Sequence, residues 1–117
     1  MFKVKPFLIK VVVATLAFSF LALNPTQAAT AIPKRIISLS PSATEILYAI
    51  GAGNQVIAVD DLSNYPSTAP ITKLSAFSPN VEALMNYKPD LIILNADATK
   101  ALEVKAALEK LKIKVFL

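Results

Sequence analysis

Four short runs of apolar residues, rich in branched aliphatic side chains, recur along the chain from residue 36 onward. They occupy residues 36–40, 56–60, 91–95 and 114–117. Their apolar character is almost continuous, whereas a strand with one solvated face alternates apolar and polar residues. Strands that are buried on both faces, as in a parallel sheet covered by helices, have this continuous pattern. The sequence therefore predicts the strands of one parallel sheet.

Amphipathic segments between these runs predict three helices. Ser42 and Glu45 have the spacing of a capping box, and the stretch from Gly51 to Gly53 stops the first helix. The second helix begins after Ser78 or Asn80 and ends before Pro89.

The third helical segment, residues 98–112, directs an apolar side toward the sheet and a charged side toward solvent. Its apolar positions are Ala101, Val104, Leu108 and Leu111. Alternating strands and helices favour right-handed crossovers and a parallel sheet. The expected fold class is therefore α/β, a parallel sheet flanked by helices in a Rossmann-like arrangement.

Residues 1–31 differ in composition from the rest of the chain. Three lysines precede an apolar run at 11–23, and small residues follow it, which is the order of a secretory signal peptide. Cleavage after Ala28 or after Ala31 would fit this pattern. An uncleaved membrane anchor is the alternative, but the apolar run of about thirteen residues is shorter than the ~20 that a spanning helix needs.

No cysteine follows the apolar run, so a lipid-anchored lipoprotein is not expected. We interpret residues 1–31 as a cleavable signal peptide and residues 32–117 as an exported domain. Because the chain ends inside its last predicted strand, we interpret 32–117 as the N-terminal part of a longer domain.

The charge balance argues against a nucleic-acid partner. The chain has 12 Lys and Arg against 8 Asp and Glu, but the segment 1–31 holds three of the lysines and no acid. The remainder is therefore close to neutral. The chain also has no His and no Cys, which excludes Ser-His-Asp and Cys-His catalysis, disulfides and the usual zinc sites within it.

Polar residues end three of the predicted strands. Ser40, Asp60 and Asn95 stand at the carboxyl ends, where open parallel sheets bind ligands. The plainer interpretation is that strand ends are polar because they reach solvent. Asp60 and Asp61 with Asp97 would suit a hard cation, but solvated loop acids are the better interpretation, and we predict no metal site.

The segment from Asp60 to Pro79 lacks a regular pattern and is long for a loop inside a compact domain. It holds Leu62, Tyr65 and Phe77, and this apolar and aromatic content disfavours disorder. We therefore expect a surface that grips a bulky, partly apolar ligand.

Three ordered motifs resemble one family. They are Arg35 to Gly51 (RIISLSPSATEILYAIG), Asp61 to Pro66 (DLSNYP) and Asn80 to Ile93 (NVEALMNYKPDLII). In sequence and spacing they resemble the periplasmic binding proteins of ABC importers for vitamin B12, iron-siderophores and haem. The SNYP loop is most similar to the cobalamin-binding branch.

This resemblance implies two α/β lobes joined by a long rigid helix, with ligand held between them. It implies ligand contacts from Pro41, Ser42, Leu62, Tyr65, Phe77 and Asn95. Leu62 stands where the cobalamin binders place a tyrosine, and Phe77 and Asn95 stand at tryptophan positions. Phe77 thus keeps one stacking surface.

The resemblance also gives Glu82 a role, because it matches a lobe-surface glutamate that docks on arginines of the membrane permease. An acid in the first turn of a helix is well placed for a charge-assisted pair, although helix-start electrostatics alone would also explain it.

The implied protein is a non-enzymatic solute carrier that captures cobalamin or a related corrinoid and delivers it to a permease dimer. Cobalamin is then cargo, no cofactor is expected, and membrane contact is peripheral, through the permease only. A ferric siderophore or haem is the nearer alternative ligand. An exported Rossmann-like enzyme lobe is the further alternative.

Overall fold

The computed structural model describes residues 31–117. Its elements, in chain order, are β1 (Ile36–Ser38), α2 (Pro41–Ala49), a 3₁₀ turn η1 (Gly53–Gln55), β2 (Val56–Val59), α3 (Val81–Met85), β3 (Leu91–Ile93), α4 (Ala101–Lys110) and β4 (Lys114–Phe116). The predicted α/β class with a parallel sheet is confirmed. The predicted signal peptide lies almost wholly outside the described residues.

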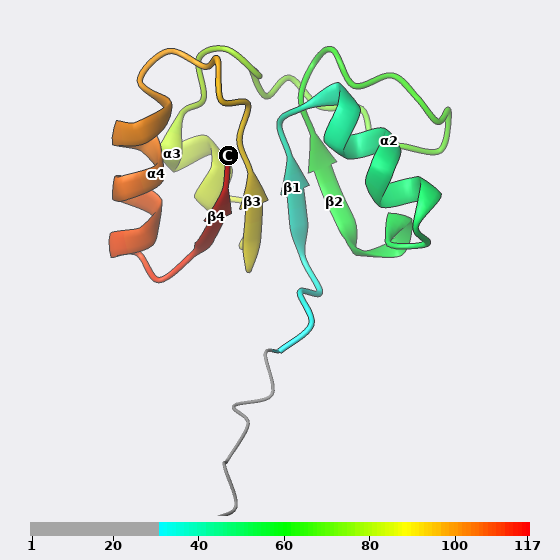
Figure 1. Cartoon of the computed structure of the whole chain (residues 1–117), viewed down its shortest axis with the longest axis horizontal. Coiled ribbons are helices and arrows are strands. Elements are labelled where there is room, and N and C mark those ends of the chain that lie inside the picture. Colours follow the sequence, from blue (N-terminus) through cyan, green and yellow to red (C-terminus); the bar gives the residue numbers. More distant parts are fainter. Residues whose placement is uncertain (1–30) are drawn as a thin grey trace, which may run out of the picture. The chain divides into compact units, whose positions relative to one another are not determined.

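The four strands form one sheet in the order β2-β1-β3-β4, and every neighbouring pair is parallel (Figure 1). β1 is central, with Ile37 paired to Ala58 of β2 and to Ile92 of β3. Each strand is one or two residues shorter than predicted, and in β1, β2 and β3 the polar residue at the predicted end lies outside the strand.

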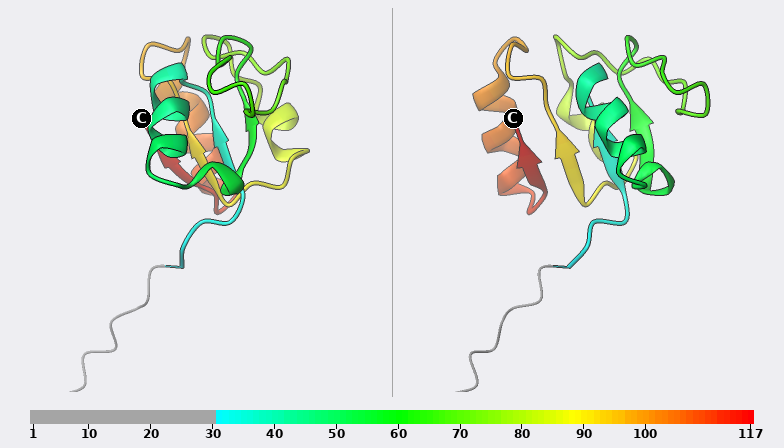
Figure 2. Two further views of the ribbon diagram at one scale, coloured as in Figure 1. Left: turned by 90° about the vertical axis from the view of Figure 1, so that its right-hand side faces the viewer. Right: turned by 45° about the vertical axis from the view of Figure 1, so that its right-hand side comes forward.

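The two faces of the sheet are covered by different helices (Figure 2). On one face Leu47 of α2 packs with Ile36, Val56 and Leu91. On the other face Leu84 of α3 and Leu108 of α4 pack with a second group of strand residues, Ile37, Leu39, Ala58, Ile92 and Leu94. Successive strand residues thus enter opposite cores, which explains why the strand sequences are continuously apolar.

Helix α2 has its N-cap two residues earlier than the capping box predicted. Ser40, not Ser42, is the N-cap: its backbone is extended, and its hydroxyl accepts a long hydrogen bond of 3.5 Å from the amide of Ala43. Pro41 occupies the first helical position, where its missing N–H costs nothing. The helix stops as predicted at Gly51, which has a φ of +85°.

Helix α4 begins at Ala101, three residues later than predicted. Lys100 adopts a left-handed conformation with φ 58°, and Ala98 lies in a preceding turn in which its amide bonds the carbonyl of Asn95. At the other end Leu111 is half exposed, contrary to its predicted place on the buried side, because the helix has already ended there. Helix α3 is short, and Asn80 is its N-cap.

The amino end of the sheet is held by polar contacts. The Asp90 carboxylate accepts hydrogen bonds from the amides of Lys34 (2.9 Å) and Arg35 (3.0 Å). The Arg35 guanidinium donates to the carbonyls of Lys88 (2.9 Å) and Tyr87 (2.7 Å). The start of β1 is thus tied to the segment that joins α3 to β3.

Within residues 31–117, no helix combines the length and the apolar character that a membrane crossing requires.

Candidate ligand-binding site

The carboxyl ends of the four strands all lie along one edge of the sheet, at the top of Figure 1. Neighbouring strands β1 and β3 lead into helices on opposite faces, α2 and α4. The connections therefore diverge between them, and such a switch point is where open α/β sheets bind ligands. The predicted residues Pro41 and Ser42 follow β1 at this edge, and Asn95 follows β3.

The long loop 60–79 also belongs to this edge, and its base is tied to the sheet. The Asp60 amide bonds the Ser38 carbonyl (3.0 Å), and the Asp61 amide bonds the Leu74 carbonyl (2.7 Å). The Thr72 hydroxyl donates to the Val59 carbonyl. The loop therefore leaves the end of β2 and returns beside it.

The three predicted ligand residues of this loop have exposed, largely apolar side chains. Leu62 is 51%, Tyr65 is 65% and Phe77 is 52% accessible. The Phe77 carbonyl accepts a 2.7 Å hydrogen bond from the amide of Thr99, which places Phe77 beside the β3–α4 connection. Exposed aromatic groups on loops held by a rigid sheet are typical of ligand-binding surfaces. The predicted apolar surface is thus exposed, although its contact with a ligand remains a prediction.

Asn95 is more constrained than the other predicted ligand residues. It is half buried, and its side-chain oxygen accepts a hydrogen bond of 3.0 Å from the amide of Asp97. Its side chain therefore shapes the turn that leads to α4. Ligand binding by Asn95 stays a prediction. Among the described residues its side-chain nitrogen has no hydrogen-bond partner, and its oxygen can accept a second bond.

Glu82 lies in the first turn of α3, shortly after the loop 60–79. Its side chain is exposed, and within residues 31–117 it forms no ion pair. The ion pairs of that region join Lys100 to Glu103 and Lys105 to Glu109, both along α4. A free surface carboxylate is compatible with docking on a basic partner, which stays a prediction.

The acidic residues of the edge do not gather around a cation position. Within the described part of the chain, no three carboxylates are grouped closely enough to hold a metal ion. The expectation that Asp60 is a solvated loop acid is wrong, since it is only 1% exposed. Its two oxygens accept from the Leu62 amide (3.1 Å) and from the Ser63 hydroxyl.

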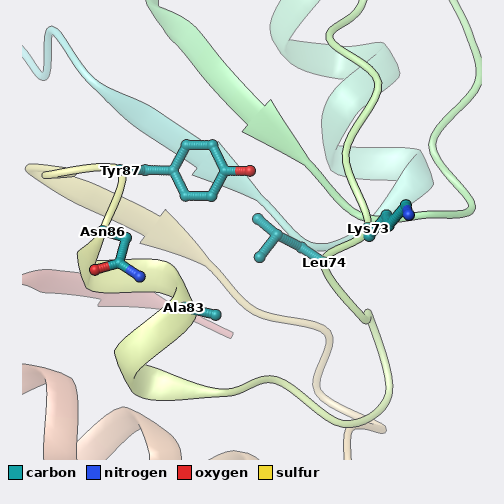
Figure 3. A pocket seen from close by; sticks show the side chains of 5 residues that line it. All are labelled: Lys73, Leu74, Ala83, Asn86 and Tyr87. Atoms are coloured by element: carbon teal, nitrogen blue, oxygen red, sulfur yellow. The ribbon is translucent and has the colours of Figure 1, made fainter.

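A cavity of about 400 Å³ lies elsewhere, between α3 and the returning loop (Figure 3). Its lining is Lys73, Leu74, Ala83, Asn86 and Tyr87. The Tyr87 ring, which follows the end of α3, points toward Leu74 and packs against the core on that face of the sheet. This cavity lies on a helix-covered face of the sheet, and none of its lining residues is a predicted ligand residue.

Sequence reasoning missed the buried hydroxyls of Thr44 and Ser63 beneath the edge. A signal was present for Thr44, which shares its helical stripe with Leu47 and Tyr48. A polar residue on an apolar stripe needs a buried partner. No comparable pattern marks Ser63, because it lies in an irregular loop.

Comparison with known proteins assigns the chain to a family. The family model described as "Periplasmic binding protein" matches residues 36–116, which contain every predicted ligand residue. The vitamin B12-binding protein of Vibrio cholerae serotype O1 is 41% identical over 85 residues, covering 70% of this chain and 31% of that protein.

Two solved structures share the fold at comparable identity. The periplasmic vitamin B12 binding protein of Vibrio cholerae superposes with a TM-score of 0.62 and 37% identity, over 72% of this chain and 33% of its own. A possible iron-binding periplasmic solute-binding protein of Staphylococcus epidermidis gives 0.63 and 36%, over 71% and 33%. This chain thus spans about a third of the length of these relatives. With its parallel sheet and a family match across nearly all of its described residues, the chain belongs to the periplasmic binding protein family.

Proposed function

We propose that this chain provides ligand-binding surface to the solute-binding component of an ABC importer, and that the solute is cobalamin or a related corrinoid. The observation that carries the proposal is the exposed trio Leu62, Tyr65 and Phe77 at the carboxyl edge of the sheet. The similarity to vitamin B12-binding proteins at 41% identity supports the choice of solute.

Binding would rest on apolar and stacking contact. A corrinoid offers a broad, partly apolar face, and an aromatic side chain with more than half of its surface accessible can bury much of that surface against it. Pro41 and Ser42, at the start of α2, would add contacts from the neighbouring connection. None of these residues has to perform chemistry, in keeping with a carrier that is not an enzyme.

Delivery to the permease would use Glu82. This residue is exposed in the first turn of α3, so its carboxylate can pair with a basic group of a membrane partner. The protein would work in the periplasm after removal of a signal peptide. Its membrane contact would then pass through the permease alone.

A ferric siderophore or haem is the second candidate ligand, favoured by the likeness to the possible iron-binding protein of Staphylococcus epidermidis. The same exposed aromatic surface would suit either, since both are bulky and partly apolar. With no His in the chain, no imidazole of this chain is available to ligate haem iron.

Calorimetric titration of the protein, expressed from its complete reading frame, tests the proposal. Cyanocobalamin, a ferric hydroxamate siderophore and haemin are titrated in parallel. We expect saturable binding of cyanocobalamin, tighter than that of the other two. Binding of haemin or siderophore with no binding of cyanocobalamin would move the assignment to the second candidate, and binding of none would refute both.

A further inference from the structure

Four polar side chains are buried together beneath the carboxyl edge. Ser38 and Thr44 are 0% exposed, Asp60 is 1% and Ser63 is 8%. They come from β1, the first turn of α2, the end of β2 and the loop 60–79, which we call the ligand loop. Polar groups are rarely removed from water without partners, because an unpaired one costs more than a paired one contributes. The hydrogen-bond partners of these four side chains therefore decide whether their burial costs stability.

Thr44 is the centre of this group. Its hydroxyl oxygen lies 2.9 Å from the Ser38 hydroxyl, 3.0 Å from the Ser40 carbonyl and 3.1 Å from the Ser63 hydroxyl. The contact to Ser63 spans 19 residues of sequence and joins α2 to the ligand loop. Thr44 thus contacts both Ser38 of β1 and Ser63 of the ligand loop.

Ser63 passes the connection on to the exposed part of the loop. Its hydroxyl donates to the Asp60 carboxylate, whose other oxygen accepts from the amide of Leu62. The Ser63 amide bonds the Asp60 carbonyl at 3.2 Å. A continuous set of hydrogen bonds therefore runs from the buried face of α2 to Leu62, one of the exposed apolar residues.

A second tie lies one turn further along α2. The Tyr48 hydroxyl lies 3.5 Å from the carbonyl of Thr68, further along the same loop. Gly53 leaves room for the Tyr48 ring, since an added Cβ there would come within 2.5 Å of it. The helix thus meets the loop at two positions on a single stripe, Thr44 and Tyr48.

We propose that Thr44 and Ser63 are positioning residues that hold the loop 61–66 in its ligand-binding conformation before ligand arrives. The inference rests on the proposed function of the loop and identifies residues that never touch the ligand. Ordering a loop during binding lowers affinity, so a loop ordered in advance binds more tightly. The hydroxyl of Thr44 supplies that order through Ser63 and Asp60.

A purely stabilising role is the competing interpretation, and it predicts different behaviour. If the hydrogen bonds only stabilise the fold, their loss lowers the unfolding free energy but leaves the affinity of folded protein unchanged. A positioning role changes affinity and the local order of the loop. The exchange of the Leu62 and Ser63 amides with solvent reports that order without any ligand.

The experiment compares Thr44→Val, which removes the hydroxyl at nearly constant shape, with Thr44→Ser, which keeps it. Ile92→Val is the control, a core truncation on the other face of the sheet. All are made in the protein expressed from its complete reading frame. Cyanocobalamin affinity is measured by calorimetry, and amide exchange by NMR under conditions where every variant is folded.

We expect Thr44→Val to weaken affinity about tenfold and to speed exchange at Leu62 and Ser63 by a similar factor, the equivalent of about one buried hydrogen bond. Thr44→Ser should stay within about twofold of wild type in both. Ile92→Val should change neither. If Thr44→Val lowers stability as Ile92→Val does, with affinity and loop exchange unchanged, the proposal is overturned.

Two results separate this inference from the proposed function. If wild type binds no cyanocobalamin, siderophore or haemin, the proposed function fails, and the exchange rates alone decide whether Thr44 orders the loop. If Thr44→Val does not fold, Ser63→Ala replaces it. It removes the link between α2 and Asp60, and unchanged loop exchange in that variant would equally overturn the proposal.

Discussion

The two ends of the sheet differ in where their polar groups find hydrogen-bond partners and in which side chains they expose. At the amino end, the Asp90 carboxylate and the Arg35 guanidinium satisfy backbone groups on two neighbouring segments. At the carboxyl end, polar groups are satisfied beneath the surface, and the exposed positions carry Leu62, Tyr65 and Phe77. Exposed aromatic groups do little for the fold, so the difference separates the end that holds the fold together from the end available for binding.

The largest expected effect comes from the exposed aromatic residues. The double variant Tyr65→Ala, Phe77→Ala should weaken cyanocobalamin binding about a hundredfold, because each ring would lose about 1.4 kcal/mol of apolar contact with ligand. Its melting temperature should stay near that of wild type, since both side chains are more than half exposed. Calorimetry and thermal unfolding measure the two quantities. If the double variant lost stability as well as affinity, the carboxyl end would also hold the fold together, and the contrast between the two ends would be wrong.

The opposite pattern is expected for Asp90→Ala at the amino end. Loss of two hydrogen bonds to backbone amides should lower the unfolding free energy by about 2 kcal/mol, with cyanocobalamin affinity unchanged. Asp97→Ala is the stability control, because its exposed carboxylate accepts no hydrogen bond among the described contacts. Urea denaturation provides the measurement. Equal losses in the two variants would remove the proposed role of Asp90.

Arg35→Lys should have a smaller effect of the same kind. The guanidinium reaches two carbonyls at once through its planar fork, whereas an ammonium group reaches them with less fixed geometry. We expect a loss of about 1 kcal/mol in unfolding free energy, measured in urea. Full stability in the lysine variant would show that charge alone suffices at this end.

The smallest effect on binding and stability is expected from Glu82→Gln, a substitution at an exposed helix position. Helix-dipole stabilisation of α3 accounts for about 0.5 kcal/mol at most, and the ligand edge is untouched. Vitamin uptake in cells should nevertheless fall strongly if Glu82 docks on the permease. Normal uptake, with the variant protein present at wild-type level, would refute that role.

Most of the framework followed from the sequence because it depends on periodicity. The continuous apolar runs at 36–38 and 91–93 matched strands buried on both faces. The helix stop at Gly51 followed from backbone freedom. The start of α2 was misplaced, since two serines and a proline offered competing caps, and Pro41 decided in favour of Ser40.

The candidate site was harder to predict from the sequence, because the hydrogen bonds beneath it join residues that are far apart in the chain. The burial of Asp60 depends on Ser63 within the loop, and that of Ser63 on Thr44, 19 residues earlier. The start of α4 depends on a left-handed Lys100, a conformation that no propensity scale favours for lysine. The only mark of this long-range contact in the sequence is that Thr44 is a polar residue on an apolar helical stripe, and no pattern marks Ser63.

Chemical-shift mapping tests the central claim most directly. The uniformly ¹⁵N-labelled protein, expressed from its complete reading frame, is titrated with cyanocobalamin, and the amide signals of both ends are followed. The account predicts saturable shifts at Ser42, Leu62, Tyr65 and Phe77, with Arg35 and Asp90 unmoved. The account would be contradicted if the amide signals of the carboxyl edge did not shift while those of Arg35 and Asp90, or those around the cavity beside Tyr87, did.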